Sequence, residues 1–153
     1  MTAAGMSVPT VDRQQLGAAA EDAALALLIE QGCSLLARNV RYKFGELDLV
    51  MRDAGTLAFV EVRFRRNSRF GGAAMSVDVA KRRKVARAAQ AWLGSHRQYA
   101  YAACRFDVVA VTPGRFNVLA VTPGRGETAA AGPNLEAMEC EWIRAAFTLD
   151  DLY

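Results

Sequence analysis

The sequence has few residues that could bind zinc or cross-link the chain. It contains one histidine and three cysteines among 153 residues, and Cys33, Cys104 and Cys140 are far apart. This spacing fits neither a zinc site nor a disulfide framework. We therefore expect reduced thiols and a cytoplasmic location. The only histidine, His96, falls near the end of a predicted helix, where an incidental position is the simpler interpretation than a catalytic one.

Long apolar runs and targeting signals are also absent. The longest apolar run, Ala23 to Ile29, has seven residues, whereas a membrane span needs about 18. Residues 1–10 lack the pattern of a secretory signal, and we expect them to form a flexible leader to a single domain over residues 11–153. Because hydrophobic residues make up 52% and charged residues only 23%, a disordered protein is excluded, and we expect no membrane partner.

Charge is distributed unevenly along the chain. Between Val62 and Phe106, eleven Lys or Arg residues stand against one acid, Asp78. From Gly126 to Tyr153 there are six acids and one base, Arg144. A basic middle favours a polyanion such as nucleic acid, although such residues can also simply face solvent. The candidate phosphate contacts are Arg65, Arg66, Arg69, Lys81, Arg82 and Lys84.

Hydrophobic periodicity predicts an α/β domain. The pattern indicates a helix over about 12–31, strands over 35–42, 46–51 and 57–64, a helix over 77–93 and a strand over 105–111. A further short helix is predicted over 135–149 from the spacing of its apolar residues. The repeated AVTPGR at 110–115 and 120–125 predicts two strands around a Pro-Gly turn. Helices and strands in this order are typical of a mixed sheet flanked by helices.

Two of the best predicted strands carry acids among apolar residues. The segment GELDLV contains Asp48, and FVEVRFR contains Glu61. If residues 53–56 form the turn between these strands, Asp48 lies directly opposite Glu61, with Cβ atoms about 5 Å apart. Carboxylates that close repel unless a cation lies between them, and Mg²⁺ prefers such oxygen ligands. The alternative is a solvated face on which Glu46 and Arg63 form a surface ion pair.

A third acid falls on the first predicted helix. At about 100° per residue, Glu21 lies at the edge of the apolar face, beside Leu28, whereas Asp22 points to the opposite side. Glu21 is therefore expected near whatever the helix packs on, and Asp22 in solvent.

These blocks resemble a known family. GELDLV, FVEVRFR, FGGAA with Lys81 in the following helix, RFDVV and IRAAF are similar to the YraN family of small bacterial proteins of unassigned function. The resemblance runs from about Gln15 to Phe147. It implies a restriction-endonuclease-like core, in the order α-β-β-β-α-β, related in architecture to Holliday-junction resolvases. It also implies Asp48 and Glu61 as metal ligands, Glu21 as a helical acid and Arg63 at the position of the superfamily's lysine.

Arginine at position 63 is a departure from that pattern. Lysine can help to deprotonate an attacking water, whereas arginine stays protonated and has a planar head. Arg63 can stabilise charge on a reacting phosphate but cannot act as a base. A metal ion, Mg²⁺ or Mn²⁺, would then have to activate the water alone.

The sequence therefore predicts a nucleic-acid-binding protein with divalent-metal-dependent phosphodiester hydrolysis. One alternative is a non-catalytic nucleic-acid-binding or adaptor protein that keeps the nuclease scaffold. Another is a purely structural partner protein, which would bind neither metal nor nucleic acid. DNA is favoured over RNA, and the sequence leaves open whether the substrate is branched and whether the protein forms a homodimer.

Overall fold

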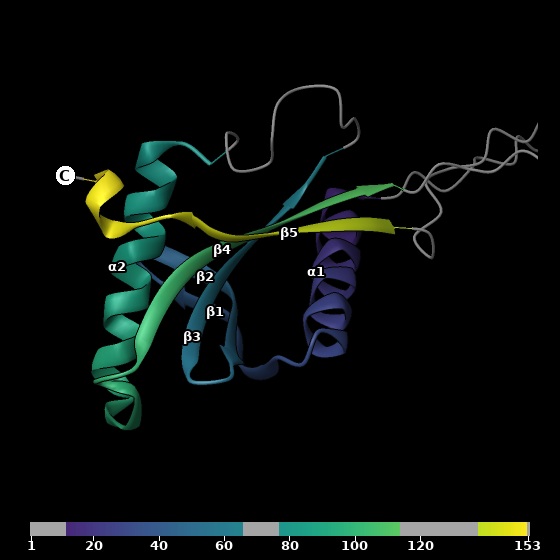
Figure 1. Ribbon diagram of the computed structural model, residues 1–153. Coiled ribbons are helices and arrows are strands. Elements are labelled where there is room, and N and C mark those ends of the chain that lie inside the picture. Colours follow the sequence, from purple (N-terminus) through teal and green to yellow (C-terminus); the bar gives the residue numbers. More distant parts are fainter. Residues whose placement is uncertain (1–11, 66–76, 114–137, 153) are drawn as a thin grey trace, which may run out of the picture.

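The chain forms a five-stranded mixed sheet with one long helix on each face (Figure 1). The computed structural model describes residues 12–65, 77–113 and 138–152. Arg66, Arg69, the predicted leader and the second copy of AVTPGR lie outside these residues. In chain order the elements are α1 (Arg13–Glu30), β1 (Ser34–Tyr42), β2 (Gly45–Asp53), β3 (Thr56–Phe64), α2 (Val79–Ser95), the 3-10 helix η2 (Arg97–Tyr99), β4 (Ala103–Pro113), β5 (Met138–Phe147) and the 3-10 helix η4 (Leu149–Leu152).

The sheet has the strand order β1-β2-β3-β4-β5. β3 and β4 are parallel and are connected through α2, whereas the other neighbours are antiparallel. The order of the first six long elements confirms the predicted α-β-β-β-α-β core. The predicted helix boundaries are also close to the observed ones, since Asp12 and Asp78 are the N-caps and Gly32, at φ 95°, follows the end of α1.

Each face of the sheet is covered by one helix, so the central strands are buried on both sides. One core cluster lies under α2 and includes Val50, Phe59 and Trp92, while the other lies under α1 and includes Leu28 and Met51. Strands covered on both faces read as nearly continuous apolar runs, which explains the sequence of β3. Among the helices of the described ranges, none is long and apolar enough to cross a membrane.

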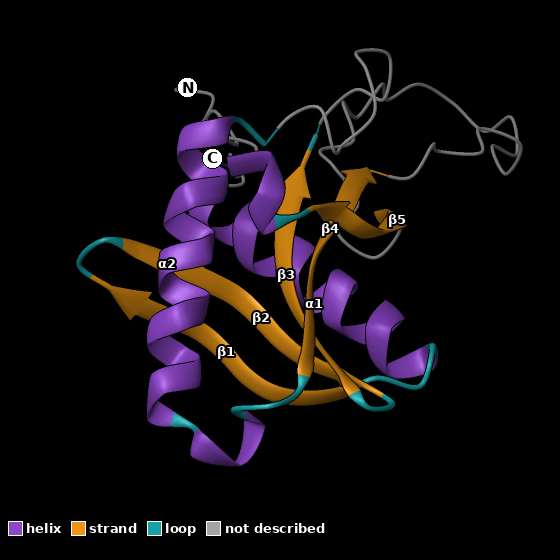
Figure 2. Cartoon of the chain, turned by 60° about the vertical axis from the view of Figure 1, so that its left-hand side comes forward, coloured by secondary structure: helices purple, strands orange, loops and turns teal. Residues whose placement is uncertain are grey.

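The sheet splits between β2 and β3. Their ladder runs from Asp53↔Thr56 through Val50↔Phe59, as the predicted turn required, and ends at Leu49↔Val60. Beyond that point β2 keeps its pairing with β1 as far as Gly45, and β3 keeps its pairing with β4 as far as Phe64. Figure 2 shows β1 and β2 running away from β3 on this side. We call this opening the fork.

The predicted helix over 135–149 is wrong, because residues 138–147 form the edge strand β5. Met138, Cys140 and Trp142 pack toward the α1 side, and the glutamates between them are exposed. Side chains that alternate between buried and exposed are typical of a strand, and this strand pairs with the edge of β4 that β3 leaves open. Ile143 faces the α2 side by the same alternation, and near Ala145, at φ 48°, the register shifts so that Ala146 also faces that side.

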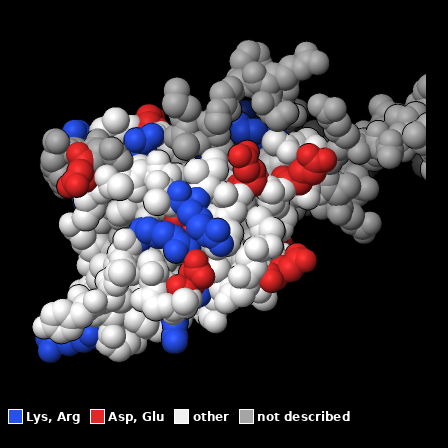
Figure 3. All heavy atoms as spheres, viewed as in Figure 1, with Lys and Arg blue, Asp and Glu red and all other residues white. Residues whose placement is uncertain are grey.

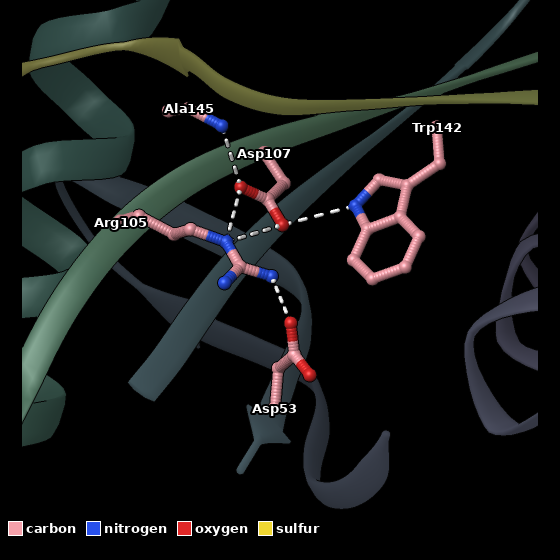
Figure 4. A network of polar contacts seen from close by, with 5 residues as sticks. All are labelled: Asp53, Arg105, Asp107, Trp142 and Ala145. Carbon is pink, nitrogen blue, oxygen red and sulfur yellow. Dashed lines mark hydrogen bonds and ion pairs between the residues drawn. The ribbon is translucent and has the colours of Figure 1, made fainter. Parts of the chain in front are cut away.

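A buried carboxylate fixes this irregular strand (Figure 4). Asp107, which is 0% exposed, accepts hydrogen bonds from the Trp142 indole at 3.0 Å and from the Ala145 N–H at 2.9 Å. The Nε of Arg105 lies 3.0 Å from both Asp107 oxygens, and its Nη2 contacts Asp53 of β2 at 2.7 Å. Because all these donors converge on one buried charge, the network joins β5 to β4 and, through Arg105, to the β2–β3 turn.

We expect Asp107→Asn to lower the free energy of unfolding by about 3–5 kcal/mol, because it removes the buried charge on which three donors converge and leaves Arg105 with Asp53 as its one charge partner among the described residues. Trp142→Phe, which removes one hydrogen bond, should cost about 1–2 kcal/mol. Urea denaturation of both variants measures these changes. Asp22→Asn is the control, since Asp22 pairs with Arg38 but is 69% exposed, and its effect should stay below about 1 kcal/mol. Equal effects of Asp107→Asn and Asp22→Asn would contradict the role given to the network.

Candidate active site

Asp48 occupies the fork and replaces a missing ladder hydrogen bond. Its Oδ2 accepts the backbone N–H of Val62 at 2.8 Å, just beyond the last paired residues of β2 and β3. The side chain thereby holds the separated strands at a fixed spacing. It is only half-buried, so part of it faces the opening.

Glu61 of β3 lies beside Asp48 of β2. It is almost completely buried, at 4% exposure. Its Oε1 lies 3.5 Å from the Nζ of Lys81 on α2. Its Oε2 accepts no hydrogen bond from a backbone, amide or cationic donor of the described residues, and the side-chain hydrogen-bond partner of Glu61 is the Asp48 carboxyl. Two carboxyl groups form a hydrogen bond only when one of them holds a proton. The fork therefore holds a carboxyl pair that needs either a proton or a cation between its oxygens.

Burial raises the pKa values of both acids, and the charge of Asp48 raises that of Glu61 further. Burial, followed by the negative charge of Asp48, raises the pKa of Glu61 from its ordinary 4.5 to about 8, and Lys81 opposes this shift. Burial also raises the pKa of Asp48, against the stabilising hydrogen bond from Val62. Without a cation between them, the two carboxyl groups therefore favour holding a proton.

Glu21 of α1 faces the same opening. A groove of about 440 Å³ runs between α1 and the strands and is lined by Glu21, Asn39, Arg41, Glu46 and Asp48, among others. Burial, and then the charge of Asp48, raises the pKa of Glu21. Asp22 instead points outward to Arg38 at 2.6 Å. The predicted difference between these neighbouring acids is confirmed.

The carboxylate pair suits a hard divalent cation. Within residues 12–65, 77–113 and 138–152, no group of three or more His, Cys, Asp or Glu side chains could hold a metal ion. Mg²⁺ commonly uses only one or two protein carboxylates and completes its shell with water and substrate phosphate. The Asp48 and Glu61 carboxylates are therefore the residues that could hold an Mg²⁺ or Mn²⁺ ion.

The cation with the stronger effect on Glu61 comes from a different element than predicted. Lys81, from the first turn of α2, lies between Glu61 and Glu46, at 3.5 Å and 3.9 Å. Arg63 lies on β3 opposite Ala110 of β4 and also lowers the pKa of Glu61, but more weakly than Lys81. A lysine ammonium is therefore present at the acids, supplied by the helix rather than by the strand.

The other predicted basic residues are dispersed. Arg65 is exposed at the end of β3. Arg82 donates to the carbonyl of Val77 at 2.8 Å and lies over the ring of Phe147. Lys84 lines a second groove with Lys81. On the face drawn in Figure 3, basic side chains gather beside acidic ones, so the charge asymmetry of the sequence gives no continuous basic surface there.

This second groove contains residues that were not predicted as a site. It has a volume of about 540 Å³ and lies between α2 and the β1–β2 hairpin, with Arg41, Lys43, Phe44 and Arg87 in its lining. The spacing of Lys81, Lys84 and Arg87 on one side of a helix was a usable signal. The hairpin residues gave none, because their approach to α2 depends on tertiary packing.

Sequence comparisons match the chain to one protein family. The model of "Uncharacterised protein family UPF0102" matches residues 20–111. A UPF0102 protein of Xanthomonas campestris is 49% identical over 139 residues, covering 91% of this chain and 96% of the relative. A UPF0102 protein of Stutzerimonas stutzeri is 43% identical over 137 residues, covering 89% and 97%. UPF0102 is the YraN family, so the resemblance found in the sequence is confirmed.

We expect the metal-free protein to lose stability as the pH rises, because of Glu61. Below pH 4.5 its contribution is fully present. Between 4.5 and about 8 the unfolded chain ionises while the folded chain keeps its proton, so the contribution falls by at most about 1.4 kcal/mol per pH unit. Glu61→Gln should abolish this part of the pH dependence and make the variant relatively more stable at pH 9 than at pH 5. Denaturation at both pH values measures this change.

The exposed acid Glu30 provides the control for that measurement. Glu30→Gln should follow the wild type at both pH values. If Glu61→Gln also follows the wild type, the proton assigned to the fork is not there.

Proposed function

This chain belongs to the uncharacterised protein family UPF0102, and we propose that it binds nucleic acid and hydrolyses phosphodiester bonds with a divalent cation, Mg²⁺ or Mn²⁺. The observation that carries the proposal is the pair of acids at the fork, half-buried Asp48 and buried Glu61, which lie against each other and both have raised pKa values. A fold does not keep such a costly pair for stability alone.

Each residue of the site has a role in this proposal. Asp48 and Glu61 would hold the cation, and Glu21 faces the same groove and would orient water within it. A bound divalent cation would supply Lewis-acid activation of the phosphodiester. Lys81 and Arg63 place positive charge beside the acids, where it would bind the scissile phosphate and offset the charge that develops on it.

The basic surroundings support a polyanionic substrate. Lys81, Lys84 and Arg87 line a groove next to the acids, and none of the described elements presents a pattern that reads bases in a duplex groove. Binding would therefore follow the backbone and shape of the nucleic acid. DNA is the expected substrate, ahead of RNA.

A second candidate is a nucleic-acid-binding or adaptor protein without turnover. The specific observation in its favour is that Lys81 already lies 3.5 Å from Glu61 and compensates part of its charge without a metal ion. The replacement of the superfamily's lysine by Arg63 is consistent with the same role.

We expect Mg²⁺- or Mn²⁺-dependent cleavage in a screen of single-stranded, duplex and branched substrates. Asp48→Asn and Glu61→Gln should each lower its rate about 10²-fold or more, because each removes a negative ligand. Asp22→Asn, which changes an exposed acid on α1, should leave the rate unchanged. If Asp48→Asn cleaves as fast as the wild type, the assignment of the active site to the fork is wrong. If the protein binds nucleic acid but cleaves no substrate, the adaptor role is favoured.

Lys81→Met tests the position of the ammonium group. Because Lys81 lowers the pKa of Glu61, its loss should move the stability transition of Glu61 to higher pH and lower any cleavage rate. Lys84→Met is the matched control, one helical turn away on the same helix and exposed, and it should leave the stability transition unchanged. Denaturation across the pH range gives this result even if the protein does not cleave. An identical shift in both variants would contradict the direct role of Lys81.

A further inference from the structure

We propose that the groove between α2 and the β1–β2 hairpin binds a nucleic-acid strand with an unpaired base, which stacks on Phe44 while basic side chains hold the phosphates. This inference rests on the proposed function in that it assumes a nucleic-acid partner. It adds where the strand lies and which form of nucleic acid is selected.

The charge of this groove is strongly one-sided. Its lining contains five basic side chains and one acid, Glu46, which lies 3.9 Å from Lys81. Arg41, Lys43, Lys84 and Arg87 are exposed and form no ion pair with any described residue. By contrast, Arg38 and Arg105 do pair with carboxylates. These cations, without an ion pair to any described residue, surround one hollow and repel each other, and a phosphate backbone relieves that repulsion.

An aromatic platform lies in the same hollow. Phe44, at the tip of the hairpin, is 43% exposed. Its ring stacks on Tyr42, with 5.3 Å between centroids and 5° between planes. Tyr42 and Phe44 both line the groove, on either side of Lys43. An exposed ring beside cations is the combination that binds single strands, because every base offers a stacking face and every nucleotide a phosphate.

The hairpin is held against the helix by its backbone. A Cβ atom on Gly45 would lie 2.5 Å from the carbonyl oxygen of Lys84, so only glycine permits this approach. The platform and the helical cations are therefore fixed relative to each other before any ligand binds. Preformed sites of this kind lose little entropy on binding.

The groove is continuous with the acids at the fork. Arg41 and Glu46 line both this groove and the groove that contains Asp48 and Glu21, and Lys81 connects it to Glu61. A strand lying in the groove thus leads to the carboxylate pair. A base within a duplex is already stacked on both sides and cannot use Phe44, so the platform selects single strands, flaps or other unpaired ends.

The test is metal-free binding of the full chain to a short thymine strand that carries one 2-aminopurine, compared with its duplex. Wild type should quench the 2-aminopurine fluorescence of the single strand. Phe44→Ala should weaken single-strand binding about 5- to 150-fold while changing duplex binding less than about twofold, and Phe44→Trp should preserve binding. Tyr101→Ala, which removes a fully exposed ring beyond α2, should bind like the wild type. Comparing DNA and RNA versions of the strand shows which of the two nucleic acids binds more tightly.

The phosphate contacts are tested by salt. The double variant Lys84→Gln/Arg87→Gln should reduce the slope of log K against log salt by about 1.4 on the single strand, since each lost contact accounts for about 0.7. An unchanged slope overturns the phosphate assignment. Equal losses for single strand and duplex in Phe44→Ala, or an equal loss in Tyr101→Ala, overturn the stacking platform.

These results are separate from those on catalysis. A protein that stacks the base but never cleaves retains this inference and loses the proposed hydrolysis. A protein that cleaves through Asp48 while Phe44→Ala binds single strands normally loses this inference alone.

Discussion

The architecture of the candidate site depends on the point where β2 stops pairing with β3. Beyond Leu49 and Val60, β2 stays paired with β1 and β3 stays paired with β4. The sheet therefore divides into two paired halves at this point. The opening leaves backbone groups that need partners, and the Asp48 carboxylate supplies one by accepting from Val62. Asp48 is half-buried, and a partly buried charge needs compensation in turn. The positions of Glu61, Lys81 and the grooves on either side follow from this one separation.

Compensation comes from the helix that covers the fork. The first turn of α2 is an unfavourable place for a cation with respect to the helix dipole, but Lys81 there reaches both Glu61 and Glu46. Asp78 caps the same turn by accepting from the Lys81 N–H at 2.7 Å. Gly45 allows the hairpin to approach this helix closely. The Asp78 cap and Gly45, which look unrelated in the sequence, therefore both help to hold Lys81 beside Glu61 and Glu46.

The sequence was sufficient for what depends on local pattern. Alternation along β2 and β3, together with the length of their turn, brought Asp48 and Glu61 onto neighbouring strands, but the ladder ends at Leu49↔Val60, so the two are not paired directly opposite each other as predicted. Helical periodicity separated Glu21 from Asp22. Pattern was insufficient where distant parts meet. The extrapolated pairing of Glu46 with Arg63 did not form, because the ladder ends earlier and Glu46 instead pairs with Arg41 in the sheet and lies near Lys81. The segment around Trp142 satisfied helical spacing, but the free edge of β4 and the buried Asp107 made it a strand.

The Asp107 network shows that the region matched by the family model is shorter than the part of the chain that must fold together. The family match covers residues 20–111 and so omits β5, although the buried carboxylate of Asp107 obtains two of its hydrogen bonds from that strand. A chain shortened to the matched region would expose the β4 edge as a row of unpaired N–H and C=O groups. Such an edge recruits strands from other molecules, so the excised fragment would favour intermolecular aggregation over the monomeric fold. The last strand, outside the family match, thus acts as an intramolecular cover for the edge of β4.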